Sequence, residues 1–240
     1  MKNNLNIQAA NVSSNDSQTR AIYNAIRKSR PGCVITWSYL RSEVLLTTTT
    51  GVVKFPILVN DQPAANINER RLNISDEFQV IEFGIFLYKV PTGQGLDEQI
   101  LQTYPNPNLF SKSGETRALQ ALYNGYFTVT LNRKQIIPYY DALQFFRVPD
   151  SQQGTTSAAI AGPVQYTIAN SAYLHSKWGL NESLPTFRMS GAIVNDVTLN
   201  ANAKDMTGTA STNYVVFFSR GFLIQNGAQF KSEKVAGIDE

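Results

Sequence analysis

The residue types that most often carry out catalysis are almost missing from this chain, since His175 is its only histidine and Cys33 its only cysteine. One histidine rules out a multi-histidine metal site, and one cysteine rules out a thiolate cluster and an intramolecular disulfide. Neither residue belongs to a nucleophile motif, and a general base needs a partner that positions it. We interpret His175 as structural or simply exposed and Cys33 as a small core residue. The sequence thus predicts no catalytic residue, no metal site and no cofactor.

Paired carboxylates are the one catalytic arrangement that this composition leaves open, because glycoside hydrolysis needs neither histidine nor cysteine. The candidate pairs are Asp76 with Glu77, Asp97 with Glu98, and Glu43 with Glu82. The first two pairs stand at predicted turns, where Asp commonly binds the backbone. Glu82 lies within an apolar strand, where it must pair with Arg or Lys or face an interface. We therefore expect a protein that is not an enzyme.

Binding chemistry is better represented than catalytic chemistry. Four cations precede Pro31 with no acid between them, namely Arg20, Arg27, Lys28 and Arg30. Clustered positive charge of this kind suits a contact with nucleic acid or with an anionic membrane surface. The alternative is a solvated helix face, or salt bridges to a neighbour.

Large aromatic side chains supply a second set of candidates. We expect Trp37, Tyr139, Tyr140 and Trp178 to lie at a subunit interface or in the core. With Tyr39, the same residues could stack on a sugar, because aromatic rings suit both uses.

Two short helices and many strands must position these residues. The helices are predicted over residues 18–29, ended by Pro31-Gly32, and over 114–123. Alternation of β-branched or aromatic residues with polar ones predicts the strands. They cover residues 33–40, 43–49, 52–59, 78–90, 126–131, 135–138, 143–148, 164–169, 187–199 and 214–224.

Local patterns add detail to this strand-rich plan. Thr49-Thr50-Gly51 and Asn132-Arg133 are predicted hairpin turns. After the first residue of the 126–131 strand, Phe127, Val129 and Leu131 should face inward. The runs at 83–88 and 214–218 are almost continuously apolar, which predicts cover on both faces by helices or by neighbouring subunits. The fold class is mainly β, a sandwich or barrel.

Composition favours a chain that packs against others. Charged residues make up 16% of the 240, below the roughly 25% of soluble domains. Asn, Gln, Ser and Thr replace them, giving a surface that repels copies of itself weakly. The first ten residues lack the apolar core of a signal peptide, and no apolar run reaches the ~20 residues of a membrane-spanning helix. We expect the chain to be made in soluble form.

We divide the chain into an N-terminal arm with the basic helix, residues 1–30, and a β-barrel domain, residues 31–240. Residues 149–163 are small, polar and rich in turn formers, which favours a linker or long loop. A division of the barrel domain near 150–162 would make a compact double barrel, and its absence would leave a single elaborated sandwich.

Four segments make up 89 of the 240 residues, namely NERRLNISDEFQVIEFGIFLYKV, QTYPNPNLF, ETRALQALYNGYFTVTLNRKQIIPYYDALQFFRVPDSQQ and NYVVFFSRGFLIQNGAQF. They resemble structural proteins of bacteriophages that infect Bacteroidetes-type hosts. The resemblance implies a jelly-roll or β-barrel shell subunit whose N-terminal arm or helix faces the capsid interior. It also implies copies of the same chain as partners, in trimers or higher assemblies, with other virion proteins and packaged nucleic acid or an internal membrane nearby.

The function expected from this resemblance is that of the major capsid protein of an icosahedral phage, which acts by self-assembly. Such a protein is assembled in the host cytoplasm and ends in the virion. The alternatives are a minor virion component, a spike or a connector, and a carbohydrate-binding β-sandwich module.

Overall fold

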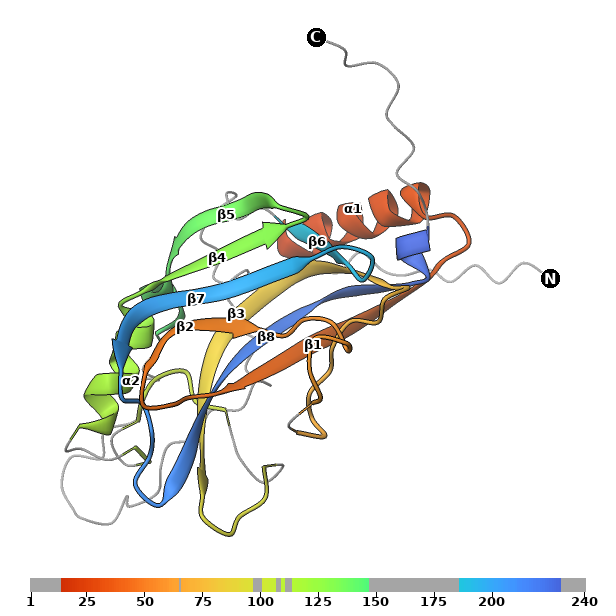
Figure 1. The fold of residues 1–240 in the computed structure, drawn as a ribbon. Coiled ribbons are helices and arrows are strands. Elements are labelled where there is room, and N and C mark those ends of the chain that lie inside the picture. The colour runs from red at the N-terminus through yellow and green to blue at the C-terminus, as the bar shows by residue number, and fades with distance from the viewer. Residues whose placement is uncertain are drawn as a thin grey trace, which may run out of the picture.

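The computed structural model describes residues 14–64, 66–96, 101–106, 109–110, 114–146 and 186–229. Two helices and eight strands make up this part of the chain (Figure 1). In chain order they are α1 (Ser14–Ser29), β1 (Val34–Leu45), β2 (Thr50–Phe55), β3 (Glu77–Pro91), α2 (Glu115–Tyr123), β4 (Tyr126–Leu131), β5 (Lys134–Asp141), β6 (Phe187–Ser190), β7 (Asn195–Lys204) and β8 (Ser211–Gln225). The short 3₁₀ helices η2 (Ala142–Phe145) and η5 (Gly227–Gln229) follow β5 and β8.

The eight strands form two antiparallel sheets that face each other. The first sheet has the order β1-β8-β3-β6, and the second has the order β2-β7-β4-β5. β1 thus pairs with β8, β2 with β7, β3 with β6 and β4 with β5. These four antiparallel pairs follow one another along the chain and alternate between the two sheets. This order is that of an eight-stranded jelly roll. The predicted mainly β, jelly-roll-type fold is confirmed.

Aromatic rings fill the space between the sheets. Phe217 of β8 stacks on Phe127 of β4 with ring centroids 5.8 Å apart, and Phe83 of β3 stacks on Phe127 at 5.5 Å. Phe55 of β2 reaches the same ring of Phe217. All four side chains are buried, so the sandwich has one continuous apolar core.

The first sheet is also covered on its outer face, the face turned away from the second sheet. At one end α1 covers Phe222 and Ile224 of β8. At the other end Leu96 and Leu101 cover Phe86, Tyr88, Val90, Val216 and Phe218. The two-sided cover predicted for 83–88 and 214–218 is therefore present. At this second end it comes from a connecting segment of the same chain, which forms a bridge between Leu87 and Gln102, rather than from a helix.

The hairpin of β4 and β5 follows the sequence prediction closely. Asn132 and Arg133 have φ values of 48° and 66°, which is the left-handed pair that a two-residue hairpin turn requires. Phe127, Val129 and Leu131 are buried, whereas the residues between them are partly exposed. Alternation along the strand thus matches one covered face.

Several predicted strand boundaries were wrong. The strands expected at 33–40 and 43–49 are the single β1, and the one expected at 187–199 is split into β6 and β7 by a turn. Residues 142–145 form η2 instead of a strand, because the carboxylate of Asp141 accepts the amide of Leu143 at 2.9 Å and starts a helical turn. The strand expected at 164–169 lies outside the described residues.

The turn predicted at Thr49-Thr50-Gly51 is not a hairpin. It joins β1 of the first sheet to β2 of the second, and so it carries the chain across the sandwich. The Thr50 hydroxyl accepts the amide of Thr47 at 2.7 Å, which fixes this corner. Strands on both sides of residues 150–162 pair within the same two sheets, and within the described residues all eight belong to one sandwich. The expected division near 150–162 falls outside them.

Candidate functional site

The basic helix α1 is held on the outer face of the first sheet by its apolar side. Ile26 is fully buried against Phe222 and Ile224, and Ile22 and Tyr23 pack beside it. The rings of Tyr23 and Phe222 lie 5.5 Å apart. Residues 22, 23 and 26 share one side of a helix, so the opposite side is left to solvent.

Three of the four predicted basic contacts lie on that exposed side. Arg20, Arg27 and Lys28 are exposed, and their spacing of seven and eight residues aligns them along one stripe. Asn24, one turn after Arg20, continues the stripe without a charge. Residues 19–30 contain no acid, so the stripe presents positive charge alone. It can attract an anionic surface, although its spacing carries no means of reading a sequence.

Arg30 behaves differently from the other three cations. Its Nε and Nη2 atoms donate to the two carboxylate oxygens of Glu77, both at 2.9 Å. These hydrogen bonds raise the pKa of the Arg30 guanidinium. Arg188 of β6 approaches the same carboxylate at 3.6 Å, and burial lowers the pKa of Arg188. This ion pair attaches the end of α1 to β3. Because the charge of Arg30 is balanced by Glu77, Arg30 does not belong to the exposed basic stripe.

The predicted aromatic residues fall into different environments. Trp37 on β1 is 51% exposed and meets the edge of Phe222 at 5.2 Å. Tyr139 on β5 is 75% exposed and packs on Tyr126 at 5.0 Å. Tyr140 is only partly buried, but its ring contacts Phe145 at 5.5 Å, and so it belongs to the flank of the core. Trp178 and His175 lie outside the described residues.

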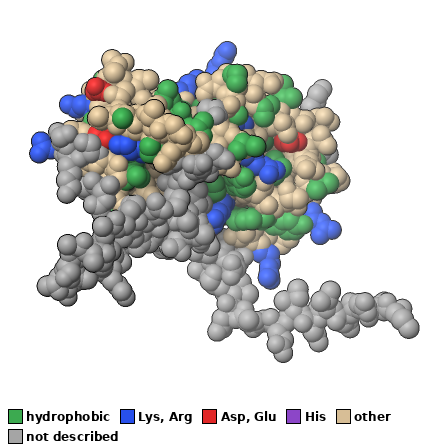
Figure 2. Space-filling model, turned by 90° about the horizontal axis from the view of Figure 1, so that it is seen from below, with side chains coloured by type: hydrophobic (Ala, Val, Ile, Leu, Met, Phe, Trp, Pro, Cys, Tyr) green, Lys and Arg blue, Asp and Glu red, His purple; other side chains and the backbone are tan. Residues whose placement is uncertain are grey.

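Beside Trp37, β1 carries a layered cluster of rings and cations. Tyr39 stacks on Phe218 with centroids 5.5 Å apart and an interplanar angle of 14°. Arg70 lies 5.6 Å above the ring of Tyr39, and Arg220 lies 5.8 Å from the ring of Phe218. Figure 2 shows a face of the molecule on which hydrophobic side chains lie in patches between protruding Lys and Arg side chains. Sequence reasoning missed Arg70 and Arg220, because only the fold brings them to these rings.

The candidate carboxylate pairs are not arranged for glycoside hydrolysis. Glu43 stands opposite Val216 on one side of β8, and Glu82 stands opposite Arg220 on its other side. Four residues along a strand span ~13 Å, more than the ~5–9.5 Å between catalytic carboxylates. Glu43 instead accepts from Arg41 at 2.6 Å and from the hydroxyl of Tyr88.

The other two carboxylate pairs give a similar picture. Asp76 accepts the amide of Asn226 at 2.9 Å, which links the end of β8 to the start of β3. This partner is 150 residues away and does not belong to the turn predicted around Asp76. Its neighbour Glu77 is bound by Arg30 and Arg188, as described above. Asp97 and Glu98 lie outside the described residues.

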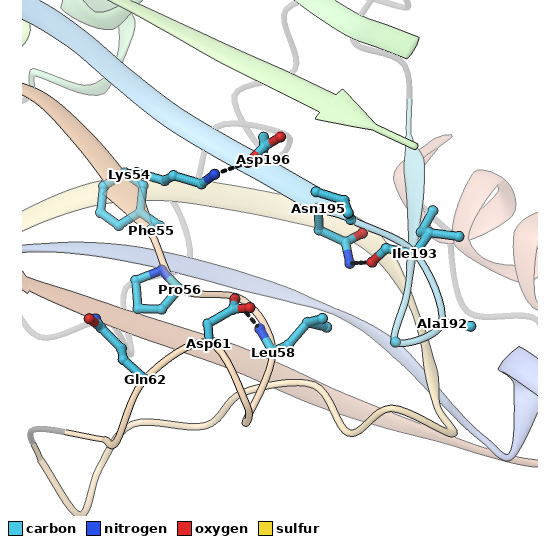
Figure 3. Close-up of a pocket in the computed structure, with 12 residues that line it drawn as sticks. Lys54, Phe55, Pro56, Leu58, Asp61, Gln62, Ala192, Ile193, Asn195 and Asp196 are labelled. Atoms are coloured by element: carbon cyan, nitrogen blue, oxygen red, sulfur yellow. Dashed lines mark hydrogen bonds and ion pairs between the residues drawn. The ribbon is translucent and has the colours of Figure 1, made fainter. Parts of the chain in front are cut away.

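A shallow cleft of about 580 Å³ opens where the end of β2 meets the turn between β6 and β7 (Figure 3). Lys54 and Asp196 pair across it, and Asp61 accepts the amides of Ile57 and Leu58, both at 2.9 Å. Asn195 donates to the carbonyl of Ile193 at 2.9 Å. Lys54, Asp61 and Asp196 thus bind one another or the backbone, and the one aromatic residue that lines the cleft, Phe55, is buried.

Within the described ranges, no group of three or more His, Cys, Asp or Glu side chains could hold a metal ion. Among the same residues, no helix is long and apolar enough to span a membrane. Cys33 is half-buried, and burial raises the pKa of its thiol. Comparisons with protein-family models, curated proteins and solved structures find no match to this chain.

Proposed function

We propose that this chain is a virion structural protein, the major capsid protein of an icosahedral phage, which acts by assembling with copies of itself. The observation that carries the proposal is the jelly-roll strand order, β1-β8-β3-β6 facing β2-β7-β4-β5. Jelly rolls of this kind build the shells of many viruses, because the rigid sandwich presents its loops and edges to neighbours. The resemblance of its segments to phage structural proteins points the same way.

The surface gives independent support for assembly. Large apolar side chains are exposed on strands of both sheets, including Trp37 on β1, Val52 on β2 and Tyr139 on β5. Exposed apolar area of this kind marks interaction surfaces when it is extensive. With only 16% charged residues in the chain, repulsion between copies is weak.

The stripe of Arg20, Arg27 and Lys28 fits a subunit whose α1 faces the capsid interior. There it would contact packaged nucleic acid, with an internal membrane as the alternative anionic partner. Because such contacts release counterions, binding should weaken steeply with salt. Replacing the three cations with Gln should reduce retention of nucleic acid and its salt dependence, while leaving the fold unchanged.

Electron micrographs and sedimentation of the purified full-length chain test the proposal directly. We expect particles, or oligomers of defined size, at micromolar concentration. A chain that stays monomeric at all concentrations, with or without nucleic acid, would contradict it. Particles carrying the chain at only a few sites, as a spike or connector, would assign it a minor virion role instead.

A carbohydrate-binding module is the second candidate, since jelly rolls also occur in lectins and the cleft at Lys54 and Asp196 is open to solvent. Sugar sites usually offer an exposed ring for stacking, and the described lining residues offer none. A glycan array separates the two functions. Binding that is lost on Trp178→Ala would favour the module, and an array without signal would favour the shell protein.

A further inference from the structure

The four edge strands of the two sheets differ in their protection against pairing with another chain. Edge strands are normally guarded by charge, proline, bulges or shortness. β2 has Lys54 and a register shift, β5 has Lys134, Pro138 and register shifts, and β6 is four residues long and carries Arg188. β1 is 12 residues long and pairs with β8 without any shift.

The first half of β1 carries none of these guards. Residues 33–39 read CVITWSY, with no charge, no proline and no glycine. Val34 is 56% exposed and Trp37 is 51% exposed. The second half is different, because Arg41 exchanges two backbone hydrogen bonds with Arg70, at 2.8 and 2.9 Å. The open stretch therefore ends where Arg70 begins to cover the edge.

The direction of the backbone groups follows from the same bridge. Arg41 bonds to Arg70, so its amide and carbonyl point away from β8. Peptide direction alternates along a strand, so the amides and carbonyls of Ile35, Trp37 and Tyr39 point to the same open edge. Among the described residues, none of these groups has a backbone partner. The edge thus offers a ladder of donors and acceptors to another strand.

We propose that residues 33–39 of β1 pair antiparallel with the same residues of a second copy, about a two-fold axis at Thr36. The stretch of open edge at residues 33–39 is limited at both ends. Gly32 turns the chain with a φ of +84°, and the amide of Cys33 already donates to Arg30. Arg70 covers the edge beyond Tyr39, at the other end. Thr36 is the middle residue of the stretch from Cys33 to Tyr39. The inference names the partner of the proposed shell protein, and so it rests on the proposed function.

This register satisfies the chemistry of both strands. Ile35 of one copy lies opposite Trp37 of the other, so their outward amides and carbonyls meet in pairs. Cys33 lies opposite Tyr39, where its carbonyl can accept the Tyr39 amide while its own amide stays bound to Arg30. Aromatic side chains pair well with β-branched ones across strands, and Thr36 meets its own copy at the axis. A two-fold contact uses the same surface on both copies. It would join the first sheet of one copy to the first sheet of the other, edge to edge. The strand pair alone falls below the ~1,200 Å² of a stable interface, so it acts with the other contacts of an assembly.

Disulfide trapping of the full-length chain tests this register. In a Cys33→Ser background, Thr36→Cys places two thiols at the axis, where Cα atoms are about 4.5 Å apart and a disulfide can form. Ser38→Cys is the matched control on the same face of the same strand. Its two copies would lie ~13 Å apart, too far to bridge. We expect mild oxidation to give disulfide-linked dimers from Thr36→Cys and not from Ser38→Cys.

A second pair of variants shows whether the edge itself is responsible. Added to the Thr36→Cys chain, Trp37→Lys puts a charge on the open edge and should lower cross-linking about tenfold. Tyr139→Lys changes an exposed aromatic residue on an edge strand of the other sheet and should leave cross-linking unchanged.

The outcomes separate this inference from the proposed function. Particles or oligomers with no cross-link at residue 36, or with equal cross-links at 36 and 38, would overturn the β1 pairing and leave the shell function standing. Dimers cross-linked at residue 36 from a chain that forms nothing larger would support the pairing and count against the shell function.

Discussion

The two sheets of the sandwich differ in how much of their outer faces is covered. In the first sheet, β3 and β8 are buried along almost their whole length, because the second sheet lies on one side and α1, or Leu96 and Leu101, lie on the other. In the second sheet, β4 and β7 alternate between buried and partly exposed residues. A strand therefore records in its sequence how many of its faces are covered.

The comparison also shows where the cover of the first sheet stops. Its outer face is covered by α1 at one end and by Leu96 and Leu101 at the other, whereas Trp37 and Tyr39 on β1 are exposed. The second sheet exposes single residues such as Val52 and Tyr139 on strands that carry charge or proline. Exposed rings beside an unguarded edge distinguish the first sheet from the second, and they are the reason why we propose that assembly uses the first sheet.

The largest expected effect comes from the core that both sheets share. Phe217→Ala removes a fully buried ring that contacts Phe55, Phe83 and Phe127. We expect the free energy of unfolding to fall by about 3–5 kcal/mol, because a cavity remains where the ring was. Urea denaturation measures the change. A loss below about 1 kcal/mol would mean that the two sheets do not pack through this ring.

A matched pair of valines tests the difference between the two outer faces. Val216 on β8 is fully buried in the cluster with Leu96 and Leu101, whereas Val52 on β2 is 66% exposed. Val216→Ala should cost about 2 kcal/mol and Val52→Ala no more than about 0.5, since only the first removes buried methyl groups. Equal losses in urea denaturation would contradict the two-sided cover of β8.

The attachment of α1 depends on the pairing of Arg30 with Glu77. Arg30→Gln should destabilise the chain by about 1.5 kcal/mol, because two charge-assisted hydrogen bonds are lost. Arg27→Gln, three residues earlier on the exposed side, should change it by less than about 0.5 kcal/mol. Hydrogen exchange of the α1 amides measures whether the helix itself becomes less protected. Unchanged protection in Arg30→Gln would show that the apolar side of α1 suffices.

The smallest effect concerns the buried hydroxyl of Tyr88 on the same sheet. Burial, followed by its hydrogen bond to Glu43, raises the pKa of Tyr88 above its usual value near 10. The folded state therefore keeps a proton that the unfolded chain loses, so stability is complete below about pH 10 and declines above it. Tyr88→Phe should cost about 1 kcal/mol at pH 7 and make the alkaline decline shallower. Denaturation at pH 7 and pH 11 measures the cost at pH 7 and the loss of stability at alkaline pH. If Tyr88→Phe loses as much stability between the two pH values as the unchanged chain, a group other than Tyr88 causes the decline.

Local patterns were enough to predict much of the fold. The hairpin at Asn132-Arg133 and the inward set of Phe127, Val129 and Leu131 depend on neighbours in the chain, and both were predicted correctly. Ile22 and Ile26, one helical turn apart in the sequence, both lie on the apolar side of α1, so this spacing alone indicates that side. The strand expected at 143–148 failed because the side chain of Asp141 bonds to the backbone and starts η2.

The candidate site was less accessible to sequence reasoning. The cluster of Arg20, Arg27, Lys28 and Arg30 could be seen, but the pairing of Arg30 joins residues 47 positions apart. The same holds for Glu43 and Glu82, which resemble a candidate pair until the register of β8 separates them. Contacts between distant segments leave no local pattern, so they could not be predicted.

The sequence by itself determined that this protein is mainly β, where most of its strands lie and which side of each is apolar. Periodicity and turn chemistry carry that information within a few residues. Only the tertiary structure decided that Thr49-Thr50-Gly51 crosses between sheets, that β1 has one open and one covered half, and that Arg30 fastens α1 while Arg20, Arg27 and Lys28 stay exposed. The physical reason is that each of these depends on which distant strand supplies the partner, and that choice is made by the packing of the whole sandwich.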